Sequence, residues 1–265
     1  MAAAAAAASG ATPVLDVRGV SKRFGGLQAL SEVGITIAPG QVYGLIGPNG
    51  AGKTTFFNVI TGLYAPDSGT FQLGGAPYEP SAVHEVAARG IARTFQNIRL
   101  FPEMTALENV MVGRHVRTKS GLLGAVFRTA AFKAEEAEIM ARAQELLDYV
   151  GIGRYAEYRA RTLSYGDQRR LEIARALATE PKLIALDEPA AGMNATEKMV
   201  LRELIDRIRN DGRTILLIEH DVKLVMGLCD RVTVLDYGKQ IAEGTPAEVQ
   251  KSEKVIEAYL GAGHH

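Results

Sequence analysis

The 265-residue sequence contains a single cysteine, Cys229, and carries no net charge, because 30 Lys and Arg residues balance 30 Asp and Glu residues. One cysteine excludes an intramolecular disulfide and a zinc cluster built on cysteines, and it suits a reducing compartment. Zero net charge argues against a strongly basic nucleic-acid-binding protein, so we expect no nucleic-acid partner. No run of about 18 apolar residues occurs, so the sequence predicts no transmembrane helix.

The remaining composition is typical of a globular α/β protein. Hydrophobic residues make up 47% and charged residues 23% of the chain, which permits a sizeable core. Glycine is abundant, with 28 residues, and indicates many tight turns or close backbone approaches. The length allows one large domain or two modest ones.

Hydrophobic periodicity predicts the order of strands and helices. Residues 1–12 form an Ala-rich start without the features of a signal peptide, and we expect it to be disordered. A stripe of apolar residues from Ile139 to Val150 predicts a long helix within a mostly helical segment at 107–151. The predicted strands are 14–20, 34–38, 41–47, 70–74, 183–187, 214–219 and 231–236, and the other predicted helices are 53–62, 81–90, 163–178, 196–210 and 222–228. This alternation on both sides of the middle segment predicts a parallel-sheet core interrupted by a helical insert.

A phosphate-binding loop is the first motif that carries chemistry. The sequence matches G-x-x-x-x-G-K-[ST] directly between a predicted strand and a predicted helix. The glycines allow successive backbone N–H groups to face phosphate oxygens. The lysine of the motif reaches the β- and γ-phosphates, and the hydroxyl of its last residue is offered to Mg²⁺ as a ligand. A glycine-rich turn that binds nothing is the alternative, and the strand and helix on either side disfavour it. The candidate nucleotide-binding residues here are Gly47, Pro48, Asn49, Gly50, Ala51, Gly52, Lys53, Thr54 and Thr55.

Acidic residues follow the apolar run at 183–186. Asp187 is suited to Mg²⁺ coordination, and Glu188 is suited to act on the water that attacks the γ-phosphate, as a base or by positioning it. Acids after a strand also cap helices, and Pro189 is compatible with that alternative. His220 follows the next apolar strand, where a histidine can hydrogen-bond both a γ-phosphate and a water, although an isolated histidine is more often structural.

A third motif begins a predicted amphipathic helix. The run L-S-Y-G-D-Q-R-R-L-E-I-A-R-A-L at 163–177 resembles the signature motif of ATP-binding-cassette (ABC) ATPases, usually L-S-G-G-Q. Tyr165 replaces a glycine and Asp167 a glutamine, whereas Ser164 and Gly166 are retained. The resemblance implies that these four residues face the ATP bound to a partner subunit.

Other residues match the family in family order across about residues 14–260. The resemblance implies that Phe24 stacks on adenine and that His220 is the switch histidine. It also implies that Gln96 touches Mg²⁺ with Thr54 and Asp187, and that Asn194 stands where the family usually has Asp. The catalytic residues implied are Glu188, His220, Lys53 and Gln96, and the cofactors are ATP and Mg²⁺.

The implied fold is an α/β P-loop NTPase core with a mixed sheet, an N-terminal antiparallel β part and a helical insert lobe. We expect one ABC domain at 13–262. Its core lobe covers about 13–95 and 180–250, its helical lobe about 97–178, and its C-terminal helix about 246–260.

Within the family, the segments at 93–105, 163–175, 187–194, 218–226 and 255–261 resemble the ATP-binding subunit of bacterial branched-chain amino acid importers, as does an insertion at about 115–132. The alternatives are the ATPase of lipopolysaccharide export, another ABC transporter, or a soluble ABC ATPase without a transport role.

The resemblance also implies partners and a location. The expected partners are a second ABC ATPase subunit, with a heterodimer favoured over a homodimer, transmembrane permease subunits and, indirectly, a periplasmic binding protein. Leu100, Phe101 and Met104 are expected to receive a permease helix or, alternatively, to pack within the insert. The chain would then lie at the cytoplasmic face of the inner membrane as a peripheral subunit.

Overall fold

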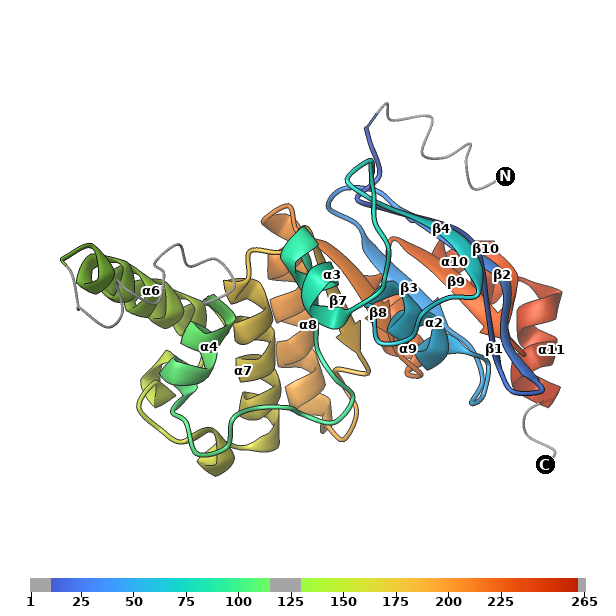
Figure 1. Cartoon of the computed structure of the whole chain (residues 1–265). Coiled ribbons are helices and arrows are strands. Elements are labelled where there is room, and N and C mark those ends of the chain that lie inside the picture. Colours follow the sequence, from blue (N-terminus) through green and yellow to red (C-terminus); the bar gives the residue numbers. More distant parts are fainter. Residues whose placement is uncertain (1–10, 115–129, 262–265) are drawn as a thin grey trace. The chain divides into compact units, whose positions relative to one another are not determined.

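The computed structural model describes residues 11–114 and 130–261, which form two compact units (Figure 1). The first unit contains residues 11–93, 182–191 and 202–261 of the described chain, and the second contains 94–114, 130–181 and 192–201. Residues 192–201 therefore group with the helical unit, whereas we expected them in the core lobe. Most of the Ala-rich start and most of the expected insertion at 115–132 lie outside the described residues.

A six-stranded mixed sheet forms the centre of the first unit, in the order β10-β9-β3-β8-β7-β6. The central strands are parallel, and only β10 runs antiparallel to its neighbour β9. Every residue of β3, β7 and β8 is buried, as expected for a parallel sheet covered on both faces. The strands are β3 (Val42–Ile46), β6 (Ile91–Arg93), β7 (Leu183–Asp187), β8 (Thr214–Ile218), β9 (Arg231–Asp236) and β10 (Lys239–Gly244).

An antiparallel sheet in the order β2-β1-β4-β5 completes the strands of this unit. The hairpin of β1 and β2 is longer than predicted. Bulges interrupt the alternation of apolar residues, so the periodicity does not indicate where the two strands end. A two-residue turn at Gly25-Gly26 connects them, with Phe24 paired to Leu27. The strands are β1 (Leu15–Phe24), β2 (Leu27–Ile37), β4 (Ser68–Leu73) and β5 (Ala76–Pro77). The mixed sheet together with this antiparallel sheet confirms the predicted fold class.

Helices pack around the strands of the first unit, and a hydrophobic cluster joins Leu15 of the antiparallel sheet, Phe57 of α2 and Leu216 of the mixed sheet. The predicted C-terminal helix at 246–260 is divided into two, because α10 ends before Lys251 and α11 starts at Glu253. The helices are α2 (Lys53–Ile60), α3 (Val83–Arg89), α9 (Val222–Leu228), α10 (Pro246–Gln250), α11 (Glu253–Gly261) and the later part of α8 (Ala195–Asn210).

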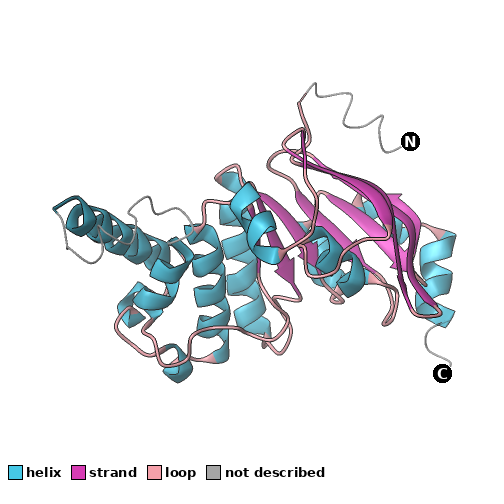
Figure 2. Cartoon of the chain, viewed as in Figure 1, coloured by secondary structure: helices cyan, strands magenta, loops and turns pink. Residues whose placement is uncertain are grey.

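The described part of the second unit is helical (Figure 2). The predicted stripe from Ile139 to Val150 is buried at Ile139, Ala143, Leu146, Leu147 and Val150. No helix within residues 11–114 and 130–261 is long and apolar enough to cross a membrane. The elements are α4 (Ala106–Arg114), α6 (Ala130–Tyr149), short 3-10 turns at Gly153–Tyr155 and Ala160–Thr162, α7 (Tyr165–Ala178) and the first turns of α8.

Candidate nucleotide site

The glycine-rich loop between β3 and α2 requires glycine at two positions for steric reasons. Gly47 has φ 151°, and a Cβ atom there would lie 2.1 Å from the carbonyl oxygen of Leu235. Gly52 has φ 98°, and its Cβ would lie 2.8 Å from the carbonyl oxygen of Ala29. Both contacts are with backbone atoms, which cannot move aside as a flexible side chain can. Glycine at 47 and 52 therefore lets the loop pass close to the neighbouring strands.

Lys53 lies inside the curve of this loop. Its Nζ donates hydrogen bonds to the carbonyl oxygens of Gly47, at 2.7 Å, and Pro48, at 2.9 Å. Burial lowers the pKa of Lys53, and the charge of Glu188 opposes that shift. The loop thus surrounds a nearly buried ammonium group.

The N-terminus of α2 adds further positive potential. Its N-cap, Gly52, provides no side-chain hydrogen bond, and no acidic residue occupies the first turn. The first N–H groups of a helix have no partners within the helix, so they favour an anion. With Lys53 beside them, and with the exposed Thr54 and half-buried Thr55 in the first turn, these donors fit the phosphates of a nucleotide.

The strand β7 delivers Asp187 to the same unit. The Asp187 side chain is buried, and its Oδ2 lies 4.0 Å from Nη2 of Arg93. Arg93 also donates to Thr61 Oγ1, at 2.7 Å, and to Asn58 Oδ1, at 3.1 Å, both on or next to α2. Arg93 therefore ties the end of β7 to the helix that follows the loop. We assigned Arg93 no such role from sequence, because these partners lie far away along the chain.

Glu188 and His220 come together at the ends of β7 and β8. The two strands are parallel neighbours, with Asp187 paired to Ile218. The N–H of Glu188 donates to the carbonyl oxygen of Ile218 at 2.9 Å, and Glu188 Oε2 lies 3.5 Å from Nδ1 of His220. Glu188 has φ 45°, which is unfavourable for a residue other than glycine and is commonest at functional sites. The surrounding contacts hold the backbone of Glu188 in this strained conformation.

Phe24 ends β1 and has an exposed aromatic ring, 42% accessible. Tyr64 packs edge-on against it with ring centroids 5.3 Å apart. Nζ of Lys22 lies 5.4 Å from the centroid of Phe24 and forms an ion pair with Asp67 at 2.9 Å. Phe24 is therefore an ordered, accessible ring, as a stacking role would require.

The motif at 163–168 starts α7 in the second unit. Ser164 is the N-cap: its Oγ accepts from the Asp167 N–H and donates to Asp167 Oδ2 at 2.8 Å. Arg170 forms an ion pair with the other oxygen of the Asp167 carboxylate. Asp167 thus supplies a negative group at the positive end of the helix, and Arg170 balances its charge. A Cβ atom added at Gly166 would lie 3.0 Å from Glu197 Oε1, which is a tight contact.

A buried arginine on α7 connects Tyr165 with the segment that contains Gln96. Arg169 is the largest fully buried side chain among the described residues. It donates to the carbonyl oxygens of Phe95, at 2.6 Å, and Gln96, at 2.7 Å, and to the Tyr165 hydroxyl, at 3.0 Å. It also pairs with the buried Glu172 at 2.9 Å, which accepts the Phe95 N–H. The backbone at Gln96 is therefore held by the same helix that begins at Ser164.

Asn194 caps α8 through a reciprocal pair of hydrogen bonds. Its N–H donates to Glu197 Oε2 at 2.9 Å, and the Glu197 N–H donates to Asn194 Oδ1 at 3.0 Å. Asparagine and aspartate are about equally good N-caps. The local conformation is therefore compatible with Asn in place of the usual Asp.

Two apolar side chains are exposed on a loop before α4. Phe101 is 45% and Met104 38% accessible, whereas Leu100 is half-buried. The buried Asn109 fixes this loop, because its amide accepts from the Phe101 N–H at 2.9 Å and donates to the carbonyl oxygens of Phe101 and Thr105. The loop presents Phe101 and Met104 in a defined conformation rather than packing them inside the insert.

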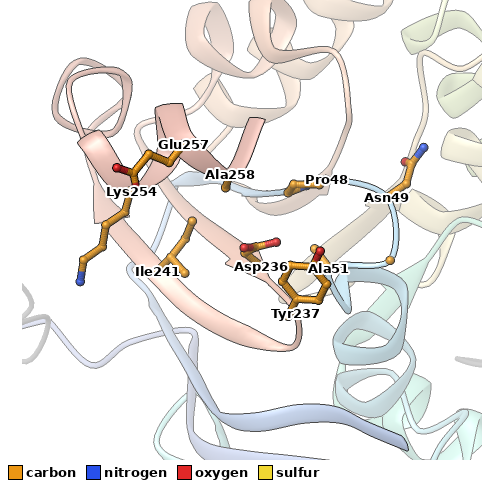
Figure 3. A pocket seen from close by; sticks show the side chains of 10 residues that line it. Pro48, Asn49, Ala51, Asp236, Tyr237, Ile241, Lys254, Glu257 and Ala258 are labelled. Carbon is orange, nitrogen blue, oxygen red and sulfur yellow. The ribbon is translucent and has the colours of Figure 1, made fainter. Parts of the chain in front are cut away.

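A cleft of about 610 Å³ lies on the tip of the glycine-rich loop (Figure 3). Residues from the loop, from the turn after β9 and from the C-terminal helices line it. The lining does not include Lys53, Thr54, Asp187 or Glu188. We therefore assign the phosphate site to the curve around Lys53 and not to this cleft. The lining residues are Pro48, Asn49, Gly50, Ala51, Asp236, Tyr237, Ile241, Lys254, Glu257 and Ala258.

The predicted Mg²⁺ ligands divide between the two units. Thr54 and Asp187 belong to the first unit, and Gln96 to the second. The described ranges, 11–114 and 130–261, contain no group of three or more His, Cys, Asp or Glu side chains that could hold a metal by themselves. Mg²⁺ usually takes one or two carboxylates together with substrate phosphates, so the donor set of a hydroxyl and a carboxylate beside an anion cradle fits it.

Comparison with known proteins identifies similar chains. The family model described as ABC transporter matches residues 30–191, and the model described as branched-chain amino acid ATP-binding cassette transporter matches residues 239–265. The chain is 47% identical over 250 residues to the high-affinity branched-chain amino acid transport ATP-binding protein LivG of Escherichia coli strain K12, covering 94% of this chain and 98% of that protein. It is 46% identical, with the same coverage, to the protein BraF of Pseudomonas aeruginosa, which carries the same description.

Solved structures are similar as well. The ADP conformation of an ATP-binding cassette of an ABC transporter matches with a TM-score of 0.82 and 33% identity, covering 94% of this chain and 99% of that chain. A nucleotide-free ATP-binding cassette from an ABC transporter matches with a TM-score of 0.79 and 32% identity, covering 93% and 98%.

Proposed function

Because the chain belongs to the ABC transporter family, we propose that it is the ATP-hydrolysing subunit of a bacterial importer of branched-chain amino acids. The proposal of ATP hydrolysis depends on the glycine-rich loop around Lys53. The same unit contains Glu188 and His220, and Oε2 of Glu188 lies 3.5 Å from Nδ1 of His220. The C-terminal family match and the descriptions of LivG and BraF support the branched-chain cargo. The descriptions of LivG and BraF favour branched-chain amino acid import over lipopolysaccharide export and over a role outside transport.

ATP would bind with its phosphates in the curve of residues 47–55 and its adenine on Phe24. Lys53 would exchange its two carbonyl partners for phosphate oxygens, which is a favourable exchange for a desolvated ammonium group. Thr54 and Asp187 would hold Mg²⁺, which supplies charge neutralisation at the phosphates when it is bound.

Glu188 would orient the attacking water and accept its proton. Its carboxylate is largely buried and faces His220. His220 would hydrogen-bond the γ-phosphate and keep the water in line with it. Such catalysis consists of positioning and charge stabilisation, with no covalent intermediate on the protein.

A second ATPase subunit would complete the site. Ser164, Tyr165, Gly166 and Asp167 would face the ATP held by that partner, and the partner's equivalent segment would face the ATP held here. ATP would close the dimer and hydrolysis would reopen it. We propose a heterodimer, as the resemblance to the branched-chain amino acid importers implies.

The permease would contact the loop that carries Phe101 and Met104. These side chains are exposed and their loop is fixed by Asn109. Arg169 holds the Gln96 backbone, so a permease helix at this loop could move the α7 end that faces the partner's ATP. The chain would then lie at the cytoplasmic face of the inner membrane, below a permease fed by a periplasmic binding protein.

Affinity purification from membranes tests this assignment. The tagged wild-type chain should retain a permease and a second, different ATPase subunit. The double variant Phe101→Glu/Met104→Glu should lose the permease, whereas Met140→Glu, which alters a comparably exposed side chain on α6, should keep it. Recovery of only identical ATPase subunits would contradict the heterodimer, and an undiminished permease yield from the double variant would contradict the docking loop.

A further inference from the structure

Glu219 is a fully buried carboxylate between two functional turns of the first unit. It follows the last residue of β8 and precedes His220. Its Oε1 accepts the Ala190 N–H at 2.8 Å, and its Oε2 accepts the His220 N–H at 3.2 Å. The Asp221 N–H donates to it as well. Backbone groups of both turns thus converge on this one side chain.

These contacts connect the surroundings of Glu188 and His220. Ala190 is two residues beyond Glu188, on the turn that leaves β7, whereas His220 and Asp221 belong to the turn that leaves β8. Glu219 Oε2 also lies 4.0 Å from Nδ1 of His220, the atom that lies 3.5 Å from Glu188. The Glu219 side chain therefore fixes both turns and also borders the imidazole.

A carboxylate suits this place better than a neutral side chain. Each of its oxygens accepts from a backbone N–H, and an amide could offer only one acceptor while its NH₂ group faced another donor. Burial raises the pKa of Glu219, and the N–H groups and His220 oppose that rise. A buried acid that is costly to keep and pairs with backbone donors of two turns indicates a role beyond filling space.

We propose that Glu219 is a positioning residue for ATP hydrolysis, which holds the Glu188 turn and the His220 turn at a fixed separation. The inference rests on the proposed function, because it concerns the reaction assigned to Glu188 and His220. Glu219 would contact neither ATP nor the attacking water. Its loss should therefore reduce turnover and leave nucleotide affinity unchanged.

Steady-state ATP hydrolysis by the transporter assembled with its partner subunits tests the proposal. Glu219→Gln should lower kcat by about 10- to 100-fold, as misplacement of catalytic groups by about 1 Å does. The Kd for ATP should change less than about twofold, because the loop around Lys53 is untouched. Glu219→Asp, which keeps the charge but is too short to reach both turns, should also lower kcat. It provides the measurement if the glutamine variant does not fold.

Two controls separate positioning from a general loss of structure. Glu243→Gln makes the same change at a largely buried carboxylate on β10, which contacts Tyr43 and Arg231. The kcat of this variant should remain at the wild-type level. In a Glu188→Gln background, Glu219→Gln should lower kcat by a smaller factor than in the wild type, because part of its effect acts through the group already removed.

Wild-type kcat in both Glu219 variants would overturn the proposal. So would a loss of ATP affinity as large as the loss of kcat. Independent, multiplicative effects of Glu188→Gln and Glu219→Gln on kcat would overturn it as well. A wild-type complex that hydrolyses no ATP, or a Glu188→Gln complex with full activity, would instead contradict the proposed function itself.

Discussion

Nδ1 of His220 lies 3.5 Å from Oε2 of Glu188, although the two residues follow different strands. The contact arises because β7 and β8 are parallel neighbours in register, so that both residues leave the sheet at the same edge. Ligand sites of parallel sheets form at this carboxyl edge. The pairing gives Glu188 a fixed orientation from which it could act on a water molecule.

Replacement of Glu188 tests that role. Glu188→Gln should reduce ATP turnover by about 10²- to 10⁴-fold, because an amide cannot accept the proton of the attacking water. The Kd for ATP should stay near the wild-type value. Glu203→Gln, at an exposed position on α8, is the matched control and should retain full turnover. Normal hydrolysis by Glu188→Gln would show that Glu188 does not have this role.

Substitutions in the glycine-rich loop should lower the free energy of unfolding. Gly47→Ala should lower the free energy of unfolding by about 2–4 kcal/mol, because its Cβ would lie 2.1 Å from a backbone oxygen. Gly26→Ala, where no atom lies within 4 Å of the added Cβ, should change stability by less than about 0.5 kcal/mol. Urea unfolding of both variants measures the difference. Equal midpoints would mean that the loop does not pass as close to β9 as the structure describes.

The buried pair of Arg169 and Glu172 should be energetically coupled. Arg169→Met should cost about 3–5 kcal/mol, because it leaves a buried carboxylate without its partner. The double variant Arg169→Met/Glu172→Met should cost less than the sum of the single variants, by about 1–3 kcal/mol. Arg142→Met, which breaks the exposed pair with Glu145, should cost about 0–1 kcal/mol. Strict additivity at the buried pair, measured by urea unfolding, would contradict this coupling.

The capping box at the start of α10 should make stability depend on pH. The Thr245 N–H donates to Glu248, and the Thr245 hydroxyl hydrogen-bonds it as well; together these bonds lower the pKa of Glu248 below its ordinary value of 4.5. A carboxylate with a lowered pKa stabilises the folded state above pH 4.5, and this contribution disappears as the pH falls through the lowered value. Glu248→Gln should therefore be less stable than the wild type at pH 7.

That difference should shrink in acid. Thermal melting of the wild type and Glu248→Gln from pH 7 to below pH 4.5 measures it, and both proteins should converge in melting temperature at the acid end. A difference that stays constant over the whole range would show that the ionised carboxylate of Glu248 does not stabilise this helix.

Much of the fold could be predicted from the sequence where elements are long, apolar and bounded by turns. The strands at 183–187 and 231–236 and the helix at 222–228 match prediction at both ends. β6 was missed because three residues are too few for a periodicity, and β10 because an edge strand needs few apolar side chains. The division between α10 and α11, at Lys251 and Ser252, was missed as well.

The candidate site was less predictable. The loop at 47–54 could be located because its motif is local and lies between a strand and a helix. Arg93, Arg169 and Glu219 have roles that depend on partners distant in sequence, so no pattern along the chain reveals them. Arg93 and Glu219 each directly follow an apolar run, which was a weak signal, whereas Arg169 stands between Gln168 and Arg170 and offered none. The structure accounts for all three with specific hydrogen bonds.

Uptake of labelled leucine tests the central claim most directly. In bacterial cells that lack their own copy of this subunit, the wild-type chain should restore ATP-dependent uptake of leucine. Glu188→Gln, produced at the same level and recovered with the same permease, should not restore it. Full uptake with Glu188→Gln, or no uptake of leucine with the wild-type chain in the assembled transporter, would contradict the account.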